Sequence, residues 1–314
     1  MELCLMIEGQ EGVSWKDWVA LALACEKHGI PALFRSDHYL NLGGEHPERG
    51  SLDAWATLAA LATVTSTLRL GTLVSPATFR HPSTLAKMVT SADHISGGRI
   101  ELGIGAGWHE REHRAYGFEF PPTRTRLEIL AEQLEVIHRN WAQGPSSFQG
   151  EHYLLSDLDA QPKPVQRPHP PLIIGGGGGA RSAALAARYA DEYNTVSPSD
   201  DVNARRDRVL EACARLGREP IAFSVMTAVV VGADQRELRD RVRRLGERIG
   251  RDGDALLREP PAGWILGTVE QAAEQLAKLA DSGVSRVMCQ HLLHDDLDAV
   301  ALLGGELSEA VRRA

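Results

Sequence analysis

Five consecutive glycines, Gly175 to Gly179, form the stretch of backbone best suited to bind an anion. They follow the apolar run Leu172-Ile173-Ile174 and precede a stretch of helical spacing that starts at Arg181. Glycine lets the backbone approach an anion closely, and a helix N-terminus offers unpaired N–H groups. The run predicts a phosphate-binding turn to which Arg181 adds a charge-assisted contact. The predicted turn residues are Gly175, Gly176, Gly177, Gly178 and Gly179.

The same run also satisfies the dinucleotide-binding pattern G-x-G-x-x-A, through Gly175, Gly177 and Ala180. A dinucleotide-binding domain carries this pattern early, in its first strand–helix unit, and four predicted units precede it here. No Gly-Lys-Ser/Thr follows the run, so it is not a Walker A loop. A phosphate-binding turn late in the chain remains the better interpretation.

A carboxylate and an imidazole stand side by side at Asp37-His38, directly after the second predicted strand. Such a pair can place a proton donor or a hydrogen-bond partner in a pocket. The alternative is a capping Asp beside a surface His. The position at the end of a strand favours the functional interpretation.

The segment His109-Glu110-Arg111-Glu112-His113 matches the zinc motif H-E-x-x-H. On a helix, His109 and His113 would share one face and could bind zinc, with a glutamate as base, as in a zinc hydrolase. The segment follows a glycine turn and is highly charged, which favours a solvated first helical turn with Glu110 and Glu112 near the positive end of the dipole. We therefore predict no bound metal and keep the zinc hydrolase as a remote alternative.

Short apolar stretches alternate with stretches of helical spacing along the whole chain and would position these residues. Because parallel strands need crossover helices, the alternation predicts a parallel sheet. Eight units favour one closed (β/α)8 barrel over residues 1–314. The predicted strands are Leu3 to Ile7, Ala32 to Ser36, Leu68 to Val74, Arg99 to Ile104, Pro171 to Gly175, Tyr193 to Val196, Phe223 to Val231 and Val284 to Cys289.

Two stretches exceed the length of a simple strand-to-helix loop, Gly105 to Pro170 and Gly232 to Gly263. Both are predicted as insertions near the catalytic mouth, the first with a small hairpin at Gln149 to Leu155. Active sites of such barrels lie at the C-terminal ends of the strands.

The predicted helices are Ser14 to His28 and Ser51 to Thr63, each capped by its first serine, Pro82 to Ile95, Arg124 to Trp141, Arg181 to Tyr189, Val202 to Leu216 and Val269 to Ser282.

The composition excludes several classes of partner. The chain has 314 residues, a formal net charge of −8 and no basic stripe, which argues against nucleic acid. The four cysteines are scattered without a C-x-x-C, which indicates reduced, buried thiols in the cytoplasm. Neither a signal-peptide pattern nor an apolar run of about 18 residues occurs, so we expect a cytoplasmic protein without membrane contact.

Several blocks resemble, in the same order, the luciferase-like oxidoreductases, bacterial enzymes that use a flavin or a deazaflavin. The resemblance covers nearly the whole chain and is strongest to the branch that depends on coenzyme F(420), a deazaflavin. The blocks are Leu70 to Pro82, Ser96 to Trp108, Pro162 to Gln166 leading to the glycine run, Gly267 to Glu270, and Gly283 to Met288.

The resemblance implies a barrel that holds the redox ring at its mouth. In deazaflavin-using members an Asp-His pair ends the second strand, and Asp37 and His38 match that pair. A non-proline cis peptide that backs the ring is implied at Thr72-Leu73. The remaining implied cofactor positions are Ser75, Gly105, Ala106, Gly107 and the glycine run for the phosphate.

The expected reaction is hydride transfer between coenzyme F(420) and a small organic substrate. We expect His38 to be the general acid/base or to stabilise charge on the ring, and Asp37 to fix its tautomer. Some deazaflavin dehydrogenases carry a Glu where this chain has Trp108, which argues against a sugar-phosphate dehydrogenase. An apolar substrate wall is expected from Tyr39, Trp55, Trp108 and Trp264.

The nearest alternative is a two-component monooxygenase that uses reduced FMN and oxygen and needs a flavin reductase as partner. A non-catalytic flavin-binding protein of the same fold is a further alternative. Family members commonly form homodimers, and we expect one here. The sequence does not identify the substrate.

Overall fold

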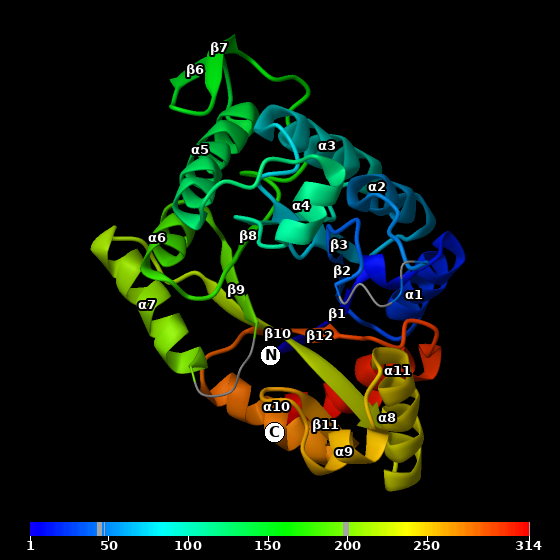
Figure 1. Ribbon diagram of the computed structural model, residues 1–314. Helices are drawn as coiled ribbons and strands as arrows, with labels where there is room; N and C mark the ends of the chain where they lie inside the picture. Colours follow the sequence, from blue (N-terminus) through cyan, green and yellow to red (C-terminus); the bar gives the residue numbers. More distant parts are fainter. Residues whose placement is uncertain (43–45, 47, 197–200, 314) are drawn as a thin grey trace.

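The computed structural model describes residues 1–42, 46, 48–196 and 201–313. In this part of the chain, eight parallel strands close into a barrel. The last barrel strand, Arg286–Gln290, pairs with the first, Glu2–Ile7, and strand Glu192–Val196 pairs with strand Ala222–Gly232. The predicted (β/α)8 barrel is confirmed (Figure 1). The barrel strands, in order around the barrel, are β1 (Glu2–Ile7), β2 (Ala32–Arg35), β3 (Arg69–Thr72), β5 (Ile100–Gly105), β8 (Leu172–Gly175), β9 (Glu192–Val196), β10 (Ala222–Gly232) and β12 (Arg286–Gln290).

Helices surround the barrel and alternate with its strands (Figure 1). They are α1 (Trp15–Lys27), α2 (Ala54–Val64), α3 (Pro82–Ser96), α4 (Glu110–Tyr116), α5 (Thr123–Trp141), α6 (Ala180–Tyr189), α7 (Val202–Arg215), α8 (Gln235–Ile249), α9 (Gly253–Arg258), α10 (Val269–Asp281), α11 (Leu297–Leu302) and α12 (Ser308–Arg313). Among the described helices, none combines the length and apolar character needed to cross a lipid bilayer.

Cap residues explain where the first two helices begin. Ser14 caps α1 through a capping box with Asp17, as predicted. The predicted cap of the second helix at Ser51 is wrong, because Asp53 accepts the N–H of Ala56 at 2.9 Å. Ser51 instead accepts a hydrogen bond of 2.8 Å from the buried Arg35, which holds the chain extended up to Asp53.

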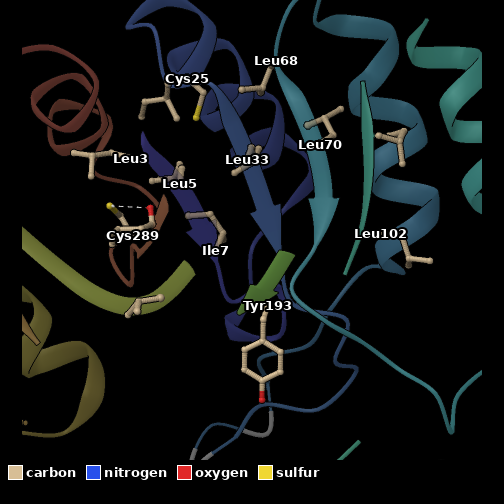
Figure 2. Close-up of a cluster of buried hydrophobic side chains, with 14 of the residues drawn as sticks. Leu3, Leu5, Ile7, Cys25, Leu33, Leu68, Leu70, Leu102, Tyr193 and Cys289 are labelled. Atoms are coloured by element: carbon tan, nitrogen blue, oxygen red, sulfur yellow. Dashed lines mark hydrogen bonds between the residues drawn. The ribbon is translucent and has the colours of Figure 1, made fainter. Parts of the chain in front are cut away.

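Alternating side chains of the strands build two apolar layers. Leu3, Leu5 and Ile7 face the helices and belong to the main core with side chains such as Leu33 and Leu70 (Figure 2). The intervening residues of the strands point into the barrel, because successive side chains of a strand face opposite sides. The inward cluster consists of Cys4, Met6, Ala32, Phe34, Leu73, Ile173 and Met288.

The two insertions differ in position. The first contributes α4 at the mouth, but the hairpin of β6 (Ser146–Gln149) and β7 (Leu154–Leu158) lies outside the helix layer, away from the barrel axis (Figure 1). The hairpin was predicted, but its placement near the mouth was wrong, because Glu132 of α5 accepts backbone N–H groups of residues 151–153 and holds it outside. The second insertion contains α8 and α9, and Arg248 of α8 donates to the carbonyl of Glu11 in the loop after β1.

The cis peptide lies one residue later than the resemblance implied, at Leu73-Val74 instead of Thr72-Leu73. The N–H of Leu73 still donates to the carbonyl of Arg35 at 2.8 Å, so the backbone pairing with β2 continues through Leu73. The chain leaves the barrel wall only after that residue and returns in the short strand β4 (Ser75–Pro76), which pairs with β5.

Candidate active site at the barrel mouth

A cavity of about 640 Å³ opens at the C-terminal ends of the barrel strands. Its size is within the usual range for pockets that bind small molecules or cofactors. The glycine run and His38 both line it, so the two features singled out in the sequence face one cavity. Its described lining includes Glu8, Ser36, His38, Leu42, Leu73, Val74, Pro76, Gly105 to Trp108, Leu127, Gly175 to Gly177, Gly179, Arg181, Asn194, Arg205, Met226 and Gln290.

The glycine turn is held from behind by Tyr193 of β9. The hydroxyl of Tyr193 accepts the N–H of Gly178 at 2.8 Å, and a Cβ at Gly176 would lie 2.6 Å from the same oxygen. Gly179 caps α6 without any side-chain hydrogen bond, so no side chain of the cap competes for the N–H groups of the first turn. Arg181 lies at the cavity wall, and Gly178 does not line the cavity.

A second arginine supports this turn and was missed in the sequence. Arg205 of α7 lines the cavity, donates to the hydroxyl of Thr195 at 2.8 Å, and packs where a Cβ of Gly178 would stand. Its spacing in the sequence is that of an ordinary helical arginine, so no local signal distinguishes it. Its guanidinium is paired with Asp201 at 2.9 Å, and that of Arg181 lies 3.7 Å from a carboxylate oxygen of Glu128. Both arginines bring N–H donors to the glycine end of the cavity, which suits a phosphate.

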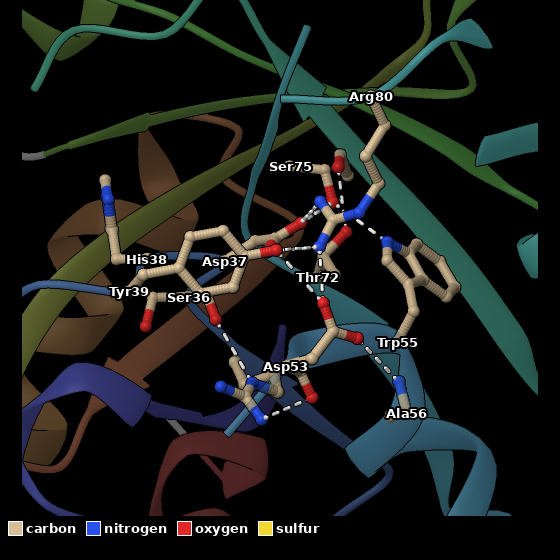
Figure 3. A network of polar contacts seen from close by, with 12 residues as sticks. Ser36, Asp37, His38, Tyr39, Asp53, Trp55, Ala56, Thr72, Ser75 and Arg80 are labelled. Carbon is tan, nitrogen blue, oxygen red and sulfur yellow. Dashed lines mark hydrogen bonds and ion pairs between the residues drawn. The ribbon is translucent and has the colours of Figure 1, made fainter. Parts of the chain in front are cut away.

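Asp37 does not orient His38, contrary to the prediction. Its buried carboxylate accepts hydrogen bonds from Arg80 at 2.5 and 3.1 Å and from the hydroxyl of Ser75 at 2.6 Å (Figure 3). Asp53 shares the same guanidinium at 2.8 Å. Adjacent residues at the end of a strand point to opposite sides, so Asp37 faces the barrel wall when His38 faces the cavity.

His38 is held instead by Glu112 of α4. Oε2 of Glu112 lies 2.8 Å from Nδ1 of His38, while Oε1 accepts the N–H groups of Tyr39 and Leu40, the latter at 3.0 Å. Glu112 is completely buried, so the predicted solvated position is wrong for this residue, although Glu110 is exposed. The missed signal is the i, i+3 spacing of His109 and Glu112, which puts both on one helix face.

This contact favours an ion pair. Burial alone lowers the pKa of His38, but the hydrogen bond and the charge of Glu112 outweigh it and raise that pKa. Burial raises the pKa of Glu112, and the contacts to His38 and to the two backbone N–H groups more than compensate and lower it. The cavity wall therefore carries an imidazole that is stabilised in its protonated form.

A second carboxylate reaches the cavity at Glu8, directly after β1, and was missed. One of its oxygens accepts from the side-chain amide of Gln290 at 2.6 Å and the other from that of Gln10 at 2.8 Å. It is 8% exposed and lines the cavity, so it can accept a further hydrogen bond from a ligand. Its position directly after a barrel strand is the signal in the sequence that could have found it.

Only one of the four predicted aromatic wall residues lines the cavity. Trp108 does so and is 60% exposed at the mouth. Tyr39 stacks on Phe79 and bonds Asp53, Trp55 donates to Ser75 in the buried polar network, and Trp264 packs in the apolar cluster of the second insertion. Large aromatic side chains fill gaps between layers, which the sequence alone does not distinguish from a pocket wall.

The predicted cofactor positions are only partly on the cavity wall. Leu73, Gly105, Ala106 and Gly107 line it. Thr72 donates to the carbonyl of Gly103 inside the barrel wall, and Ser75 belongs to the network of Asp37, so neither lines the cavity. Both side chains satisfy neighbouring buried groups, which accounts for their burial.

The zinc pair of the H-E-x-x-H motif does not form. Nε2 of His113 lies 2.6 Å from the hydroxyl of Thr78, and its Nδ1 lies 2.8 Å from the carbonyl oxygen of His109. Both nitrogens are therefore engaged within the fold. The residues present do fit a flat redox ring with a phosphate: apolar walls such as Leu73 and Val74, an acid at His38 and an anion-receptive turn at the glycine run.

Comparisons with known proteins agree with this geometry. Residues 5–286 match the family model described as luciferase-like monooxygenase. The chain is 31% identical over 242 residues to the uncharacterized protein Rv0953c of Mycobacterium tuberculosis, which covers 73% of this chain and 82% of that protein.

Two solved structures share the fold over the full chain. The monooxygenase RslO1 from Streptomyces bottropensis gives a TM-score of 0.82 at 21% identity, covering 100% of this chain and 99% of that one. An F(420)-dependent secondary alcohol dehydrogenase in complex with an F(420)–acetone adduct gives 0.80 at 19% identity, covering 99% and 100%. At these identities the likeness shows the barrel fold.

Proposed function

The chain belongs to the luciferase-like monooxygenase family, and from this premise we propose that it is an oxidoreductase that transfers a hydride between coenzyme F(420) and a small organic substrate. The observation that carries the proposal is the contact of 2.8 Å between His38 and Glu112 at the wall of the cavity that also contains the glycine turn. A deazaflavin supplies a two-electron hydride donor or acceptor when it is bound.

The residues of this chain have distinct roles in the proposal. The glycine turn and Arg181 would hold the phosphate of the cofactor, and Leu73, Val74 and Ala106, which line the same cavity, would form the apolar wall for the ring. Holding ring and substrate face to face provides much of the rate enhancement in such reactions, since it replaces an encounter in solution by a fixed geometry.

His38 manages the proton that accompanies the hydride. Protonated His38 donates to the substrate oxygen or nitrogen when a hydride is delivered, and it accepts that proton in the reverse direction. Glu112 keeps the proton available, because it stabilises the imidazolium. Glu8, which follows the neighbouring strand and lines the same cavity, accepts a hydrogen bond from the substrate and orients it.

The test is a pair of binding titrations followed by turnover. Coenzyme F(420) and FMN are each titrated into the full chain and binding is followed by fluorescence. We expect the deazaflavin to bind more tightly, and we expect reduced or oxidised F(420) to be consumed with a panel of small alcohols and carbonyl compounds without oxygen. Tight binding of FMN with no binding of the deazaflavin contradicts the proposal.

The second candidate is an FMN-dependent monooxygenase supplied by a separate flavin reductase. The structural likeness to the monooxygenase RslO1 favours it, and the same cavity can hold FMN. An oxygen electrode separates the two candidates: oxygen uptake that requires reduced FMN and an organic substrate supports the monooxygenase. A deazaflavin enzyme consumes no oxygen in this assay.

We further propose that the chain acts as a cytoplasmic homodimer formed by one barrel domain per subunit. The support is the family, whose members commonly dimerise. Light scattering of the purified chain tests the subunit number, and a monomeric mass at micromolar concentration contradicts it.

A further inference from the structure

Two imidazoles and one carboxylate converge beside the cavity, and the proposed hydride transfer uses only two of these three groups, His38 and Glu112. The ligand atoms of His38, His109 and Glu112 all lie within 4.8 Å of one another. Oε2 of Glu112 is 2.8 Å from Nδ1 of His38 and 3.6 Å from Nδ1 of His109. His38 comes from the end of β2, and the other two come from the start of α4.

His109 is the member of this trio whose buried ring nitrogen has no hydrogen-bond partner among the described residues. The residue is 7% exposed, and the nitrogen without a partner is Nδ1. Its ring is stacked on Trp108 at 5.1 Å and lies edge-on to His38 at 5.7 Å, so its orientation is fixed by packing. Buried polar atoms without a partner are rare, and here one points toward a carboxylate that is too distant for a hydrogen bond.

The two distances from the carboxylate oxygen to the imidazole nitrogens are close to those of a metal site. Zinc binds imidazole nitrogen and carboxylate oxygen at about 2.0–2.2 Å in tetrahedral geometry, which places neighbouring ligand atoms about 3.3 Å apart. The separations of 2.8 and 3.6 Å from the Glu112 oxygen lie on either side of that value. The ligand atoms of the two imidazoles lie within 4.8 Å of each other, so side-chain shifts let the three groups close on one ion.

We propose that His38, His109 and Glu112 form a binding site for a divalent transition-metal ion, with Zn²⁺ as the ion that suits two imidazoles and one carboxylate. The ion replaces the proton shared by His38 and Glu112, and that proton leaves to solvent. Oε1 of Glu112 keeps its hydrogen bonds to the N–H groups of Tyr39 and Leu40, which fix the carboxylate as an outer shell of partners does in metal sites. The fourth position is left to water or to a ligand in the cavity.

This site differs from the one that the H-E-x-x-H motif suggests. It uses His109 from the motif but replaces His113 by His38, which is distant in sequence, because both nitrogens of His113 are engaged elsewhere. It also takes Glu112 as a ligand, whereas the motif would use Glu110 as a base. The consequence for catalysis rests on the proposed function: a bound ion removes His38 as an acid, so zinc inhibits turnover.

The experiment uses the untagged full chain, stripped with a chelator and titrated with Zn²⁺ by calorimetry. We expect one ion per chain with a dissociation constant in the micromolar range or tighter. His109→Phe keeps a ring on Trp108 but removes the ligand, and it should weaken binding by roughly 100-fold, the upper range for losing even an outer-shell partner. Glu110→Gln, on the exposed face of the same helix, is the matched control and should bind zinc as the unmodified chain does.

Several outcomes overturn the proposal. They are the absence of stoichiometric binding, a His109→Phe variant with unchanged affinity, and loss of binding in His113→Gln while that variant keeps its thermal transition. Titration of coenzyme F(420) into the same samples separates this proposal from the proposed function. His109 does not line the cofactor cavity, so His109→Phe should bind the cofactor with unchanged affinity, which also shows that the variant is folded.

Discussion

Glu112 and His38 are 74 residues apart in the sequence, and their side chains meet at 2.8 Å on the wall of the barrel cavity. Asp37, the immediate neighbour of His38, is turned away and binds Arg80. The partner of the candidate acid therefore comes from the helix over the mouth and not from the strand that carries it. This division of roles leads to predictions that treat the two carboxylates differently.

Replacing the acid tests its role directly. His38→Ala should reduce turnover by roughly 100-fold or more, because the variant loses proton transfer in the reacting complex. Cofactor affinity should change little, since the phosphate turn and the apolar wall are intact. The measurements are a steady-state rate with the substrate found in the panel and a fluorescence titration. Unchanged turnover would remove His38 from the mechanism.

Glu112→Gln should move the pH dependence of turnover. The amide keeps an oxygen for the N–H groups of Tyr39 and Leu40 but loses the charge, so burial dominates and the pKa of His38 falls. The limb that reports His38 protonation should shift to lower pH in chelator-treated enzyme, with turnover at neutral pH reduced roughly tenfold. Glu110→Gln, which removes an exposed carboxylate of the same helix, should leave the profile unchanged.

The same pair makes stability depend on pH. The raised pKa of His38 contributes stability that is fully present below its unfolded pKa and is lost as pH rises through the folded pKa. The lowered pKa of Glu112 contributes stability that is present above its unfolded pKa and is lost as pH falls through the folded pKa. The difference in the free energy of unfolding between the unmodified chain and Glu112→Gln should be largest between about pH 4.5 and 6.5. Urea denaturation at several pH values measures it, and a difference that does not vary with pH would contradict the ion pair.

Asp37→Asn should lower the free energy of unfolding and change the pKa of His38 much less than Glu112→Gln does. The carboxylate and its Arg80 partner are 1% and 10% exposed, and breaking such a buried pair costs about 3 kcal/mol. The pH limb assigned to His38 should move much less than in Glu112→Gln, because Asp37 acts on that ring through its charge alone and makes no hydrogen bond to it. A shift as large as that of Glu112→Gln with unchanged unfolding free energy would restore the role that the sequence suggested for Asp37.

Two neighbouring glycines should respond in different ways. A Cβ at Gly177 meets no atom within 4 Å and enters open space at the cavity, so Gly177→Ala should keep its thermal transition and weaken cofactor binding by roughly tenfold. Gly178 has a φ of +76° and a Cβ there would lie 2.5 Å from Arg205, so Gly178→Ala should lose about 1–2 kcal/mol of stability from the left-handed backbone alone. Melting curves and fluorescence titrations of both variants check this contrast. Equal effects of the two substitutions on binding would show that the turn is not the phosphate site.

The sequence alone was sufficient to predict the barrel fold and the end of the barrel at which the cavity opens. Apolar runs separated by helical spacing reflect burial on both faces of a parallel strand, which is a local property of the chain. The glycine run and His38 could be placed in one cavity for the same reason, since both follow strands whose C-terminal ends meet. Glu8 was within reach of that argument, because it directly follows Ile7.

The partners of these residues could not be predicted from the sequence. The residues around Glu112 are charged, as in a solvent-exposed helix. The helix lies over the end of β2 only because of the path that the chain takes after Gly107, and the local sequence does not predict that path. The sequence likewise does not distinguish Trp55 and Tyr39 from aromatic residues of a pocket wall. In the structure Trp55 donates a hydrogen bond to Ser75. The hydroxyl of Tyr39 donates to Asp53 and accepts from Arg80. Such contacts depend on how distant segments pack, and no spacing in the chain encodes them.

The hydrogen bonds of Glu112 to the backbone of Tyr39 and Leu40 connect the helix over the mouth to the loop that presents His38. A sequence change that moves this helix therefore also moves the carboxylate that contacts His38. A graft of the α4 segment from a relative would have to bring its own carboxylate at this position to keep both the imidazole and the backbone N–H groups of Tyr39 and Leu40 bound.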